Sequence, residues 1–165
     1  MRIGIALGSN LGDRLANLRA ARDAIADLAA DKRVLASCVY ETEPVNCEPG
    51  AGKFINAVLE IEYDGDPTAL LEKLIRIEES LGRDRDHASN VSRKIDIDLL
   101  YADAVVIDNE RLQLPHRRLH ERRFVLQPLA DIRPDLVLPN QTKSVSELLA
   151  EIKDSAKVSC LAEKW

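Results

Sequence analysis

The sequence predicts one domain of the α+β class, with an antiparallel sheet and helices packed on one face of it. Four segments alternate in the manner of β-strands, and two others repeat hydrophobic residues with the period of an α-helix. The chain has 165 residues, which is enough for one domain with a hydrophobic core. We therefore expect residues 1–165 to form a single domain.

The first three predicted elements are a strand, a helix and a second strand. Residues 3–7 alternate large hydrophobic and small residues, and the segment 8–13 is rich in turn-forming residues. A helix with one apolar stripe is expected from about Arg14, and Asp31 marks the break after it. The segment Val34–Thr42 is expected to form the second strand.

The next three predicted elements are a strand, a helix and a strand. Ile55–Tyr63 alternates again, and Asp66 followed by Pro67 is typical of a helix N-terminus. This helix should end at Gly82, and Arg93–Tyr101 should form the fourth strand. The resulting order, β-α-β-β-α-β, is the ferredoxin-like arrangement, with both helices on one face of the antiparallel sheet.

The remaining residues are expected to add to this core without forming a second one. Val105–Ile107 is a possible strand, and a segment punctuated by prolines runs to about Pro139. The sequence from Ser144 to Glu147 is a capping box, which predicts a short final amphipathic helix extending to Ile152.

The most informative chemistry lies in the fourth predicted strand. Asp96 and Asp98 alternate with Ile95, Ile97 and Leu99, so both carboxylates should leave the same face of the strand. Two like charges this close repel each other, and a cation between them would relieve the repulsion. Mg²⁺ commonly takes one or two carboxylates together with substrate phosphates. The alternative interpretation is an edge strand with a solvated acidic face.

Other candidate residues surround this strand in the sequence. His116 follows Pro115 in an arginine-rich stretch. A guanidinium group can donate two parallel hydrogen bonds to phosphate oxygens. Phe54 and Phe124 are the only phenylalanines and could stack on a flat heterocycle, although core packing is an alternative role for both. The loops 43–53 and 82–92 should border the site. The neighbouring arginines are Arg83, Arg85, Arg93, Arg111, Arg117, Arg118, Arg122 and Arg123.

Composition excludes several classes of protein. The net charge of −5 argues against general nucleic-acid binding. No segment has the pattern of a signal peptide or the length of a membrane span. The three cysteines are widely spaced, so we expect neither a disulfide framework nor a zinc site and predict a cytoplasmic protein.

Several ordered motifs resemble those of the 6-hydroxymethyl-7,8-dihydropterin pyrophosphokinase family of folate biosynthesis. The resemblance covers about residues 3–139. A single motif is weak to moderate evidence for the family, whereas all of the motifs in the same order are highly specific for it. The motifs are Ile5–Asp13, Tyr40–Pro44, Phe54–Ala57, Glu78, Gly82–Arg85, Arg93–Asp98, Leu114–His116 and Arg122–Leu129.

The resemblance implies a ferredoxin-like fold and the transfer of pyrophosphate from ATP to the hydroxymethyl group of the reduced pterin, with release of AMP. We expect ATP and the reduced pterin as small-molecule substrates, no nucleic-acid or membrane partner, and a monomer. Asp96 and Asp98 would hold two Mg²⁺ ions, and Arg83 would steady the transferring group together with Arg93. By the same resemblance, ATP would be bound by Glu78, Arg85, Arg93, Arg111, His116 and Arg122, and the pterin by Thr42, Val45, Phe54, Asn56 and Phe124.

One segment departs from the family pattern. The family usually has Arg-Trp-Gly-Pro-Arg before its metal-binding strand, whereas this chain has Ser89-Asn90-Val91-Ser92-Arg93. The missing arginine and tryptophan leave open two alternatives. One is a non-catalytic ferredoxin-like module that binds a nucleotide or pterin as a regulator, and the other is a related transferase that acts on a different pterin.

Overall fold

The main sheet is antiparallel and has six strands. In the computed structural model, which describes residues 1–43, 52–82, 93–154 and 156–165, five of them follow the order β5-β1-β4-β3-β8, and β2 also pairs with β4. Strands β6 and β7 form a separate pair. The strands are β1 (Arg2–Ser9), β2 (Leu35–Ala36), β3 (Val39–Thr42), β4 (Phe54–Glu62), β5 (Asp96–Ala102), β6 (Ile107–Asp108), β7 (Gln113–Leu114) and β8 (Val158–Ala162).

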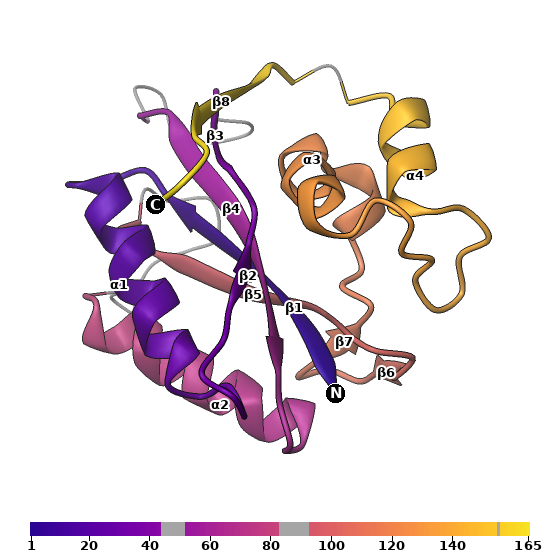
Figure 1. The fold of residues 1–165 in the computed structure, drawn as a ribbon, viewed down its shortest axis with the longest axis horizontal. Coiled ribbons are helices and arrows are strands. Elements are labelled where there is room, and N and C mark those ends of the chain that lie inside the picture. Colours follow the sequence, from indigo (N-terminus) through magenta and orange to yellow (C-terminus); the bar gives the residue numbers. More distant parts are fainter. Residues whose placement is uncertain (44–51, 83–92, 155) are drawn as a thin grey trace.

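Helices cover both faces of this sheet. Figure 1 shows α1 and α2 on one side of it and α3 and α4 on the other. None of the helices in the described part of the chain is long and apolar enough to cross a membrane. The helices are α1 (Arg14–Ala26), α2 (Pro67–Ser80), α3 (Arg123–Ile132) and α4 (Val145–Glu151), with a 3₁₀ turn at Leu119–Glu121.

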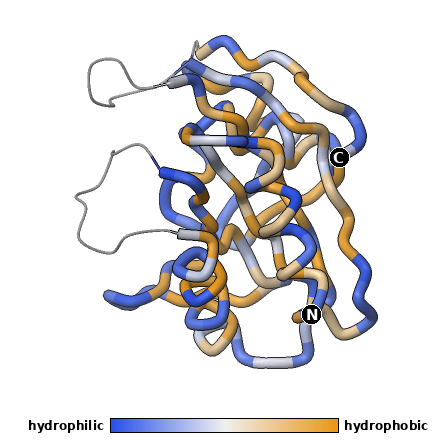
Figure 2. The backbone as a smooth tube through the Cα atoms, turned by 90° about the vertical axis from the view of Figure 1, so that its left-hand side faces the viewer, coloured by the Kyte–Doolittle hydropathy of each residue, from blue (hydrophilic) through white to orange (hydrophobic). Residues whose placement is uncertain are grey.

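The first face of the sheet packs against α1 and α2. Ile3, Ile5 and Leu7 of β1 are buried against Leu18 of α1 and Leu74 of α2. Both helices begin with an aspartate whose side chain accepts a backbone N–H in the first turn. Figure 2 shows hydrophobic and hydrophilic residues alternating along much of the chain, as expected for elements with one buried side.

The second face packs against α3 and α4. Val58 of β4 and Leu100 of β5 are buried against Leu126 and Leu129 of α3, and Val145 of α4 completes this second core. The capping box at the start of α4 is present as predicted, with both reciprocal hydrogen bonds between Ser144 and Glu147. The hydrophobic residues on the second face of the sheet therefore form a separate core with α3 and α4.

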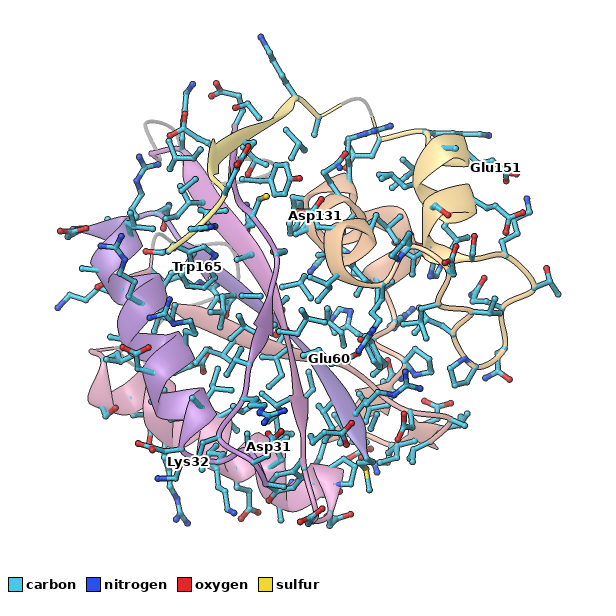
Figure 3. The ribbon with its side chains drawn as sticks, in the orientation of Figure 1. Asp31, Lys32, Glu60, Asp131, Glu151 and Trp165 are labelled. Carbon is cyan, nitrogen blue, oxygen red and sulfur yellow. The ribbon has the colours of Figure 1, made fainter. Side chains whose placement is uncertain are left out.

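A buried carboxylate joins β5 and α3 across the second face. Glu60, labelled in Figure 3, accepts hydrogen bonds from the Tyr101 hydroxyl and from the Arg133 guanidinium at the end of α3. Burial and this hydrogen bond raise the pKa of Tyr101, so its hydroxyl stays a donor. The Tyr101 ring lies over Gly4, where any Cβ would be 2.1 Å from a ring carbon. Gly4 therefore leaves the space that the contact needs.

The structure corrects three predictions about local structure. The segment Val34–Thr42 is not one strand but two short ones, β2 and β3. The possible strand at Val105–Ile107 is displaced, because β6 begins only at Ile107. The segment before Pro139 contains the helix α3, and the chain ends in a strand, β8, neither of which was predicted.

Candidate active site

A cavity of about 300 Å³ opens on the second face of the sheet, beside the start of α3. Its lining includes residues of β1, β3, β4 and β5, of the segment preceding α3, of the first turn of α3, and Asp154 near the C-terminus. The predicted site residues in this lining are Thr42, Phe54, Asn56, Arg93, Asp96, Asp98, His116, Arg122 and Phe124. Residues from distant parts of the sequence thus meet in one hollow of the size expected for small-molecule sites.

Strand register explains why these side chains converge. Gly8 of β1 lies between Asn56 of β4 and Asp96 of β5, and Ala6 is opposite Asp98. The Cβ of any larger residue at Gly8 would lie 3.3 Å from the Asn56 side-chain oxygen. The small residues on β1 therefore form the floor of the cavity, and the polar side chains of the neighbouring strands form its walls.

The two aspartates line the same cavity, as the alternation predicted. The Arg93 guanidinium donates to Asp96 at 2.7 Å, which places a positive charge against this carboxylate. Asn10, a residue that the sequence interpretation did not assign to the site, accepts the Arg93 backbone N–H at 2.7 Å and donates its own to the Arg93 carbonyl. The end of β1 thereby fixes the backbone from which Arg93 reaches Asp96.

Glu78 supports the aspartate strand from outside the cavity. Its carboxylate is buried on α2 and accepts the backbone N–H of Ile97 at 2.6 Å. Because β5 is at one edge of the sheet, this bond satisfies a strand N–H from the helix side. Glu78 thus holds the residue between the two aspartates, and it is not part of the described cavity lining.

His116 reaches the cavity from the segment after the cis Leu114–Pro115 bond. Its backbone N–H donates to the Leu100 carbonyl at 2.7 Å, and its Nδ1 accepts the Arg118 N–H at 3.2 Å. The neutral ring therefore carries its proton on Nε2. Burial lowers the pKa of His116 below its ordinary value, and the positive charges of Arg122 and Arg118 lower it further.

Arg122 and Phe124 enter the cavity from the start of α3. The Arg122 guanidinium lies over the Phe124 ring, 5.6 Å from its centre. Burial, followed by repulsion from Arg118, lowers the pKa of Arg122, although a guanidinium retains its charge. The cavity therefore brings arginine side chains close to the two aspartates, and these guanidinium groups can contact phosphate oxygens.

The other end of the cavity offers a neutral polar edge. Asn56 donates from Nδ2 to the Thr42 hydroxyl oxygen at 3.0 Å, and both side chains are buried. The Thr42 hydrogen is left to donate to another acceptor, and the Asn56 carbonyl oxygen is an acceptor. Phe54 lies half-buried on the cavity wall at the start of β4. This combination suits a flat heterocycle with donors and acceptors on its edge.

Besides Glu78, four predicted site residues are not placed in the cavity. Arg111 is exposed between β6 and β7 and pairs with Glu72 of α2 at 3.1 Å. Val45, Arg83 and Arg85 lie outside the described residues, as does the altered segment 89–92.

The sequence interpretation did not assign to the site four charged residues that line the cavity. These residues are Glu43, Arg118, Glu121 and Asp154, whereas the exposed Arg117 is not in the lining. A signal for Arg118 was present in the arginine-rich stretch. Asp154 lies in a segment with no helix or strand pattern, so nothing in the sequence connected it with the site.

The two aspartates suit a hard divalent cation, because both present oxygen ligands to one cavity that also holds phosphate-type binding groups. A metal at Asp96 would compete with its ion pair to Arg93. Within the described residues no group of three or more potential side-chain ligands gathers, so a metal here would take further ligands from substrate or water.

An antiparallel α/β domain with paired carboxylates, cations and aromatic rings in one cavity has the features of an enzyme for phosphorylated substrates. The chain belongs to the 7,8-dihydro-6-hydroxymethylpterin-pyrophosphokinase family, whose model matches residues 4–134. This result confirms the family resemblance found in the sequence.

Relatives named 2-amino-4-hydroxy-6-hydroxymethyldihydropteridine pyrophosphokinase are similar over most of their length. The Haemophilus influenzae protein is 39% identical over 150 residues, covering 91% of this chain and 92% of its own. The Methylorubrum extorquens protein is 40% identical over 154 residues, covering 93% and 95%.

A solved structure supports the fold. A crystal structure of Plasmodium falciparum HPPK-DHPS matches 99% of this chain with a TM-score of 0.71 and 14% identity. This chain spans 50% of the Plasmodium chain.

Proposed function

We propose that this chain transfers pyrophosphate from ATP to the hydroxymethyl group of 6-hydroxymethyl-7,8-dihydropterin in folate biosynthesis. The observation that carries the proposal is the shared cavity: the Asp96 and Asp98 pair, arginine and histidine side chains and the two phenylalanines all line one space. Family membership supplies the identity of the two substrates.

The reaction requires charge stabilisation and alignment more than a strong base. The pterin hydroxyl oxygen bonds to the β-phosphorus of ATP and loses its proton, while the bond from that phosphorus to the oxygen of AMP breaks. Arg93, His116 and Arg122 bind phosphate oxygens, with His116 donating from Nε2.

Asp96 and Asp98 hold Mg²⁺ in this proposal, and we expect two ions. Bound Mg²⁺ supplies neutralisation of the phosphate charge and orientation of the reacting oxygens. The shared face of the two aspartates supports this assignment, because it allows both carboxylates to contact ions in the same cavity.

The reduced pterin binds at the neutral end of the cavity. Thr42 and Asn56 hydrogen bond to its edge, and Phe54 and Phe124 contact its ring faces. Val45, Arg83, Arg85 and Arg111 remain predicted ligands of the substrates. Glu78 acts on the nucleotide side by fixing the strand that carries Asp96 and Asp98.

The proposed activity has a direct assay. The purified protein should form AMP from ATP only when 6-hydroxymethyl-7,8-dihydropterin is present, and removal of Mg²⁺ with EDTA should stop the reaction until Mg²⁺ is restored. Binding of both substrates without AMP formation would favour the non-catalytic module. Turnover with another reduced pterin only would indicate the related transferase.

ATP binding should be accompanied by proton uptake at His116. In the unbound protein its pKa lies below the ordinary value of 6.5, so the ring is neutral at pH 7, and phosphate negative charge beside it should raise that pKa. Calorimetry of a non-hydrolysable ATP analogue at pH 6.5, in two buffers of different ionisation enthalpy, should detect uptake of a fraction of a proton.

The matched variant is His116→Gln, which should lose the uptake. The same depressed pKa implies that the unfolded chain binds more protons than the folded one as pH falls below 6.5. His116 therefore lowers the free energy of unfolding as the pH falls through its folded pKa, and the glutamine variant should be less sensitive to pH in that window. Equal proton uptake in both proteins would assign it to another group.

The core is ferredoxin-like in this proposal. The element order β1-α1-β3-β4-α2-β5 and the strand order β5-β1-β4-β3 support that assignment. The single domain, the monomeric state and the cytoplasmic location remain predictions from the sequence.

A further inference from the structure

The C-terminal segment contributes to the cavity through Asp154. This residue lies 20 positions beyond the last residue that the family model matches, residue 134, and yet it lines the same cavity as Arg122 and Phe124. No role for it follows from the reaction chemistry described above. Asp154 instead contacts the first residue of α3.

Asp154 and Arg123 form a two-point contact between the tail and α3. The Asp154 carboxylate accepts a hydrogen bond from the backbone N–H of Arg123 at 3.0 Å. The main-chain carbonyl oxygen of Asp154 accepts a second one from the Arg123 guanidinium at 2.8 Å. The other carboxylate oxygen accepts the Ala156 N–H at 2.8 Å. The side chain is therefore shared between the first residue of α3 and the tail itself.

Asp154 supplies a cap that the local sequence of α3 lacks. Arg122 is in the N-cap position, and its side chain makes no capping hydrogen bond. The first N–H groups of a helix have no partner within the helix, and a carboxylate there is also favoured by the helix dipole. A residue 31 positions away along the chain thus fulfils the role usually taken by the N-cap side chain.

The tail that carries Asp154 is fixed to the strand that carries Thr42. In β8, Val158 is paired with Thr42 and Cys160 with Tyr40 of β3. The last residue, Trp165, donates from its indole to the Ser37 carbonyl at 2.8 Å and lies beneath the Arg22 guanidinium of α1. Figure 3 labels this tryptophan beside α1, on the other side of β3 and β8 from α3.

The other end of α3 is tied to the same strand. Asp131, also labelled in Figure 3, accepts from the Tyr40 hydroxyl at 2.8 Å and from the Cys38 N–H at 3.2 Å. Asp131 thus fixes the C-terminal half of α3 to β3, while Asp154 contacts the first residue of the helix. The first turn of α3 carries Arg122 and Phe124 into the cavity.

We propose that Asp154 is a positioning residue of the active site, which holds the first turn of α3 so that Phe124 contacts the reduced pterin. The identity of this ligand rests on the proposed function. The C-terminal strand then serves the site indirectly, because it connects the pterin-facing Thr42 on β3 with the pterin-facing Phe124 on α3.

The test compares Asp154→Ala, Asp154→Asn and the control Glu163→Ala in the full chain. Glu163 is an exposed carboxylate on the same tail. Without ligand, amide hydrogen exchange at Arg123 and Phe124 should become about fivefold faster in Asp154→Ala, the factor that corresponds to a typical capping bond. The dissociation constant for 6-hydroxymethyl-7,8-dihydropterin should rise by a similar factor, about fivefold.

Asp154→Asn keeps an acceptor oxygen and should restore exchange and pterin affinity to within about twofold of the unchanged protein, as should Glu163→Ala. In Asp154→Ala the affinity for a non-hydrolysable ATP analogue should fall less than the affinity for the pterin, because Arg122 in this turn is only one of several proposed phosphate ligands.

Three results would overturn the proposal. Unchanged exchange in Asp154→Ala would show that this residue does not hold the first turn. Faster exchange with unchanged pterin affinity would show that the turn need not be held for binding. An equal loss of affinity for both ligands would indicate a general structural role. If the unsubstituted protein bound no pterin, the proposed function would fail, and the exchange comparison would still decide whether Asp154 holds the helix.

Discussion

Replacing either Asp96 or Asp98 with asparagine should remove most pyrophosphate transfer and leave the fold intact. The loss of one negative ligand from a Mg²⁺ site should cost about 3–4 kcal/mol of transition-state stabilisation, or about 10²–10³ in kcat/KM. Asp96 is partly exposed and pairs with Arg93, so its replacement should lower the melting temperature by less than about 4 °C.

The control for this prediction is Asp103→Asn just beyond the far end of β5. Asp103 has a positive φ of 41°, which asparagine tolerates, and its carboxylate pairs with Arg2 at 3.0 Å outside the cavity. This variant removes one negative charge, as the Asp96→Asn and Asp98→Asn variants do, and it should retain normal activity. Rate measurements over a Mg²⁺ titration would separate weaker metal binding from lost chemistry. Near-normal turnover in Asp96→Asn or Asp98→Asn would exclude that residue as a metal ligand.

The aspartate pair could be predicted from the sequence because a strand has a simple period. Residues two positions apart share a face whatever the tertiary structure, so Asp96 and Asp98 had to point the same way once β5 formed. The placement of Asn56 opposite Gly8 follows from the antiparallel register. That register was not predictable from either strand alone, because it depends on which strands become neighbours.

The helix α3 was not predicted because its sequence contains residues that are unfavourable for a helix. Pro128 lies inside it, and its N-terminus has arginines where capping residues are usual. Its apolar residues nevertheless pack on Val58 and Leu100 of the sheet. Tertiary packing and the cap from Asp154 therefore stabilise a helix that local propensity does not favour.

The strand break at β2 and β3 has a side-chain cause. The Ser37 hydroxyl accepts the backbone N–H of Val58 at 2.9 Å and donates to the Cys38 carbonyl at 2.7 Å. A serine side chain thus replaces one regular sheet contact, which a reading of hydrophobic alternation does not detect. Strand β8 is similarly hidden, because it is mostly exposed and lacks a clear alternating pattern.

Resemblance and geometry agree less well for Glu78 and Arg111. The family resemblance implies nucleotide binding for both, whereas Glu78 is buried and accepts the Ile97 N–H, and Arg111 pairs with Glu72 on the surface. A motif records that a residue type recurs at a position and does not distinguish ligand contact from support of a neighbouring strand. The contacts of Glu78 favour the supporting role, since its carboxylate holds the strand between the two aspartates.

Phe124→Ala should weaken pterin binding much more than ATP binding. By analogy with base–aromatic stacking, loss of one ring face should cost about 1–3 kcal/mol, or about fivefold to 150-fold in the dissociation constant for the pterin. Phe124 is only half-buried and lines the cavity, so its ring is accessible to a ligand. Calorimetric titration with the pterin and with a non-hydrolysable ATP analogue measures the two affinities separately.

The contact between the Arg122 guanidinium and the Phe124 ring complicates this experiment, because the ring also orients a predicted phosphate ligand. Phe124→Leu keeps apolar volume without an aromatic face and should show the same preference for loss of pterin binding. Leu126→Ala on the same helix removes a fully buried core side chain and should cost about 2–5 kcal/mol of stability. If Phe124→Ala instead lost stability and both ligands together, as expected for Leu126→Ala, Phe124 would be a core residue of α3.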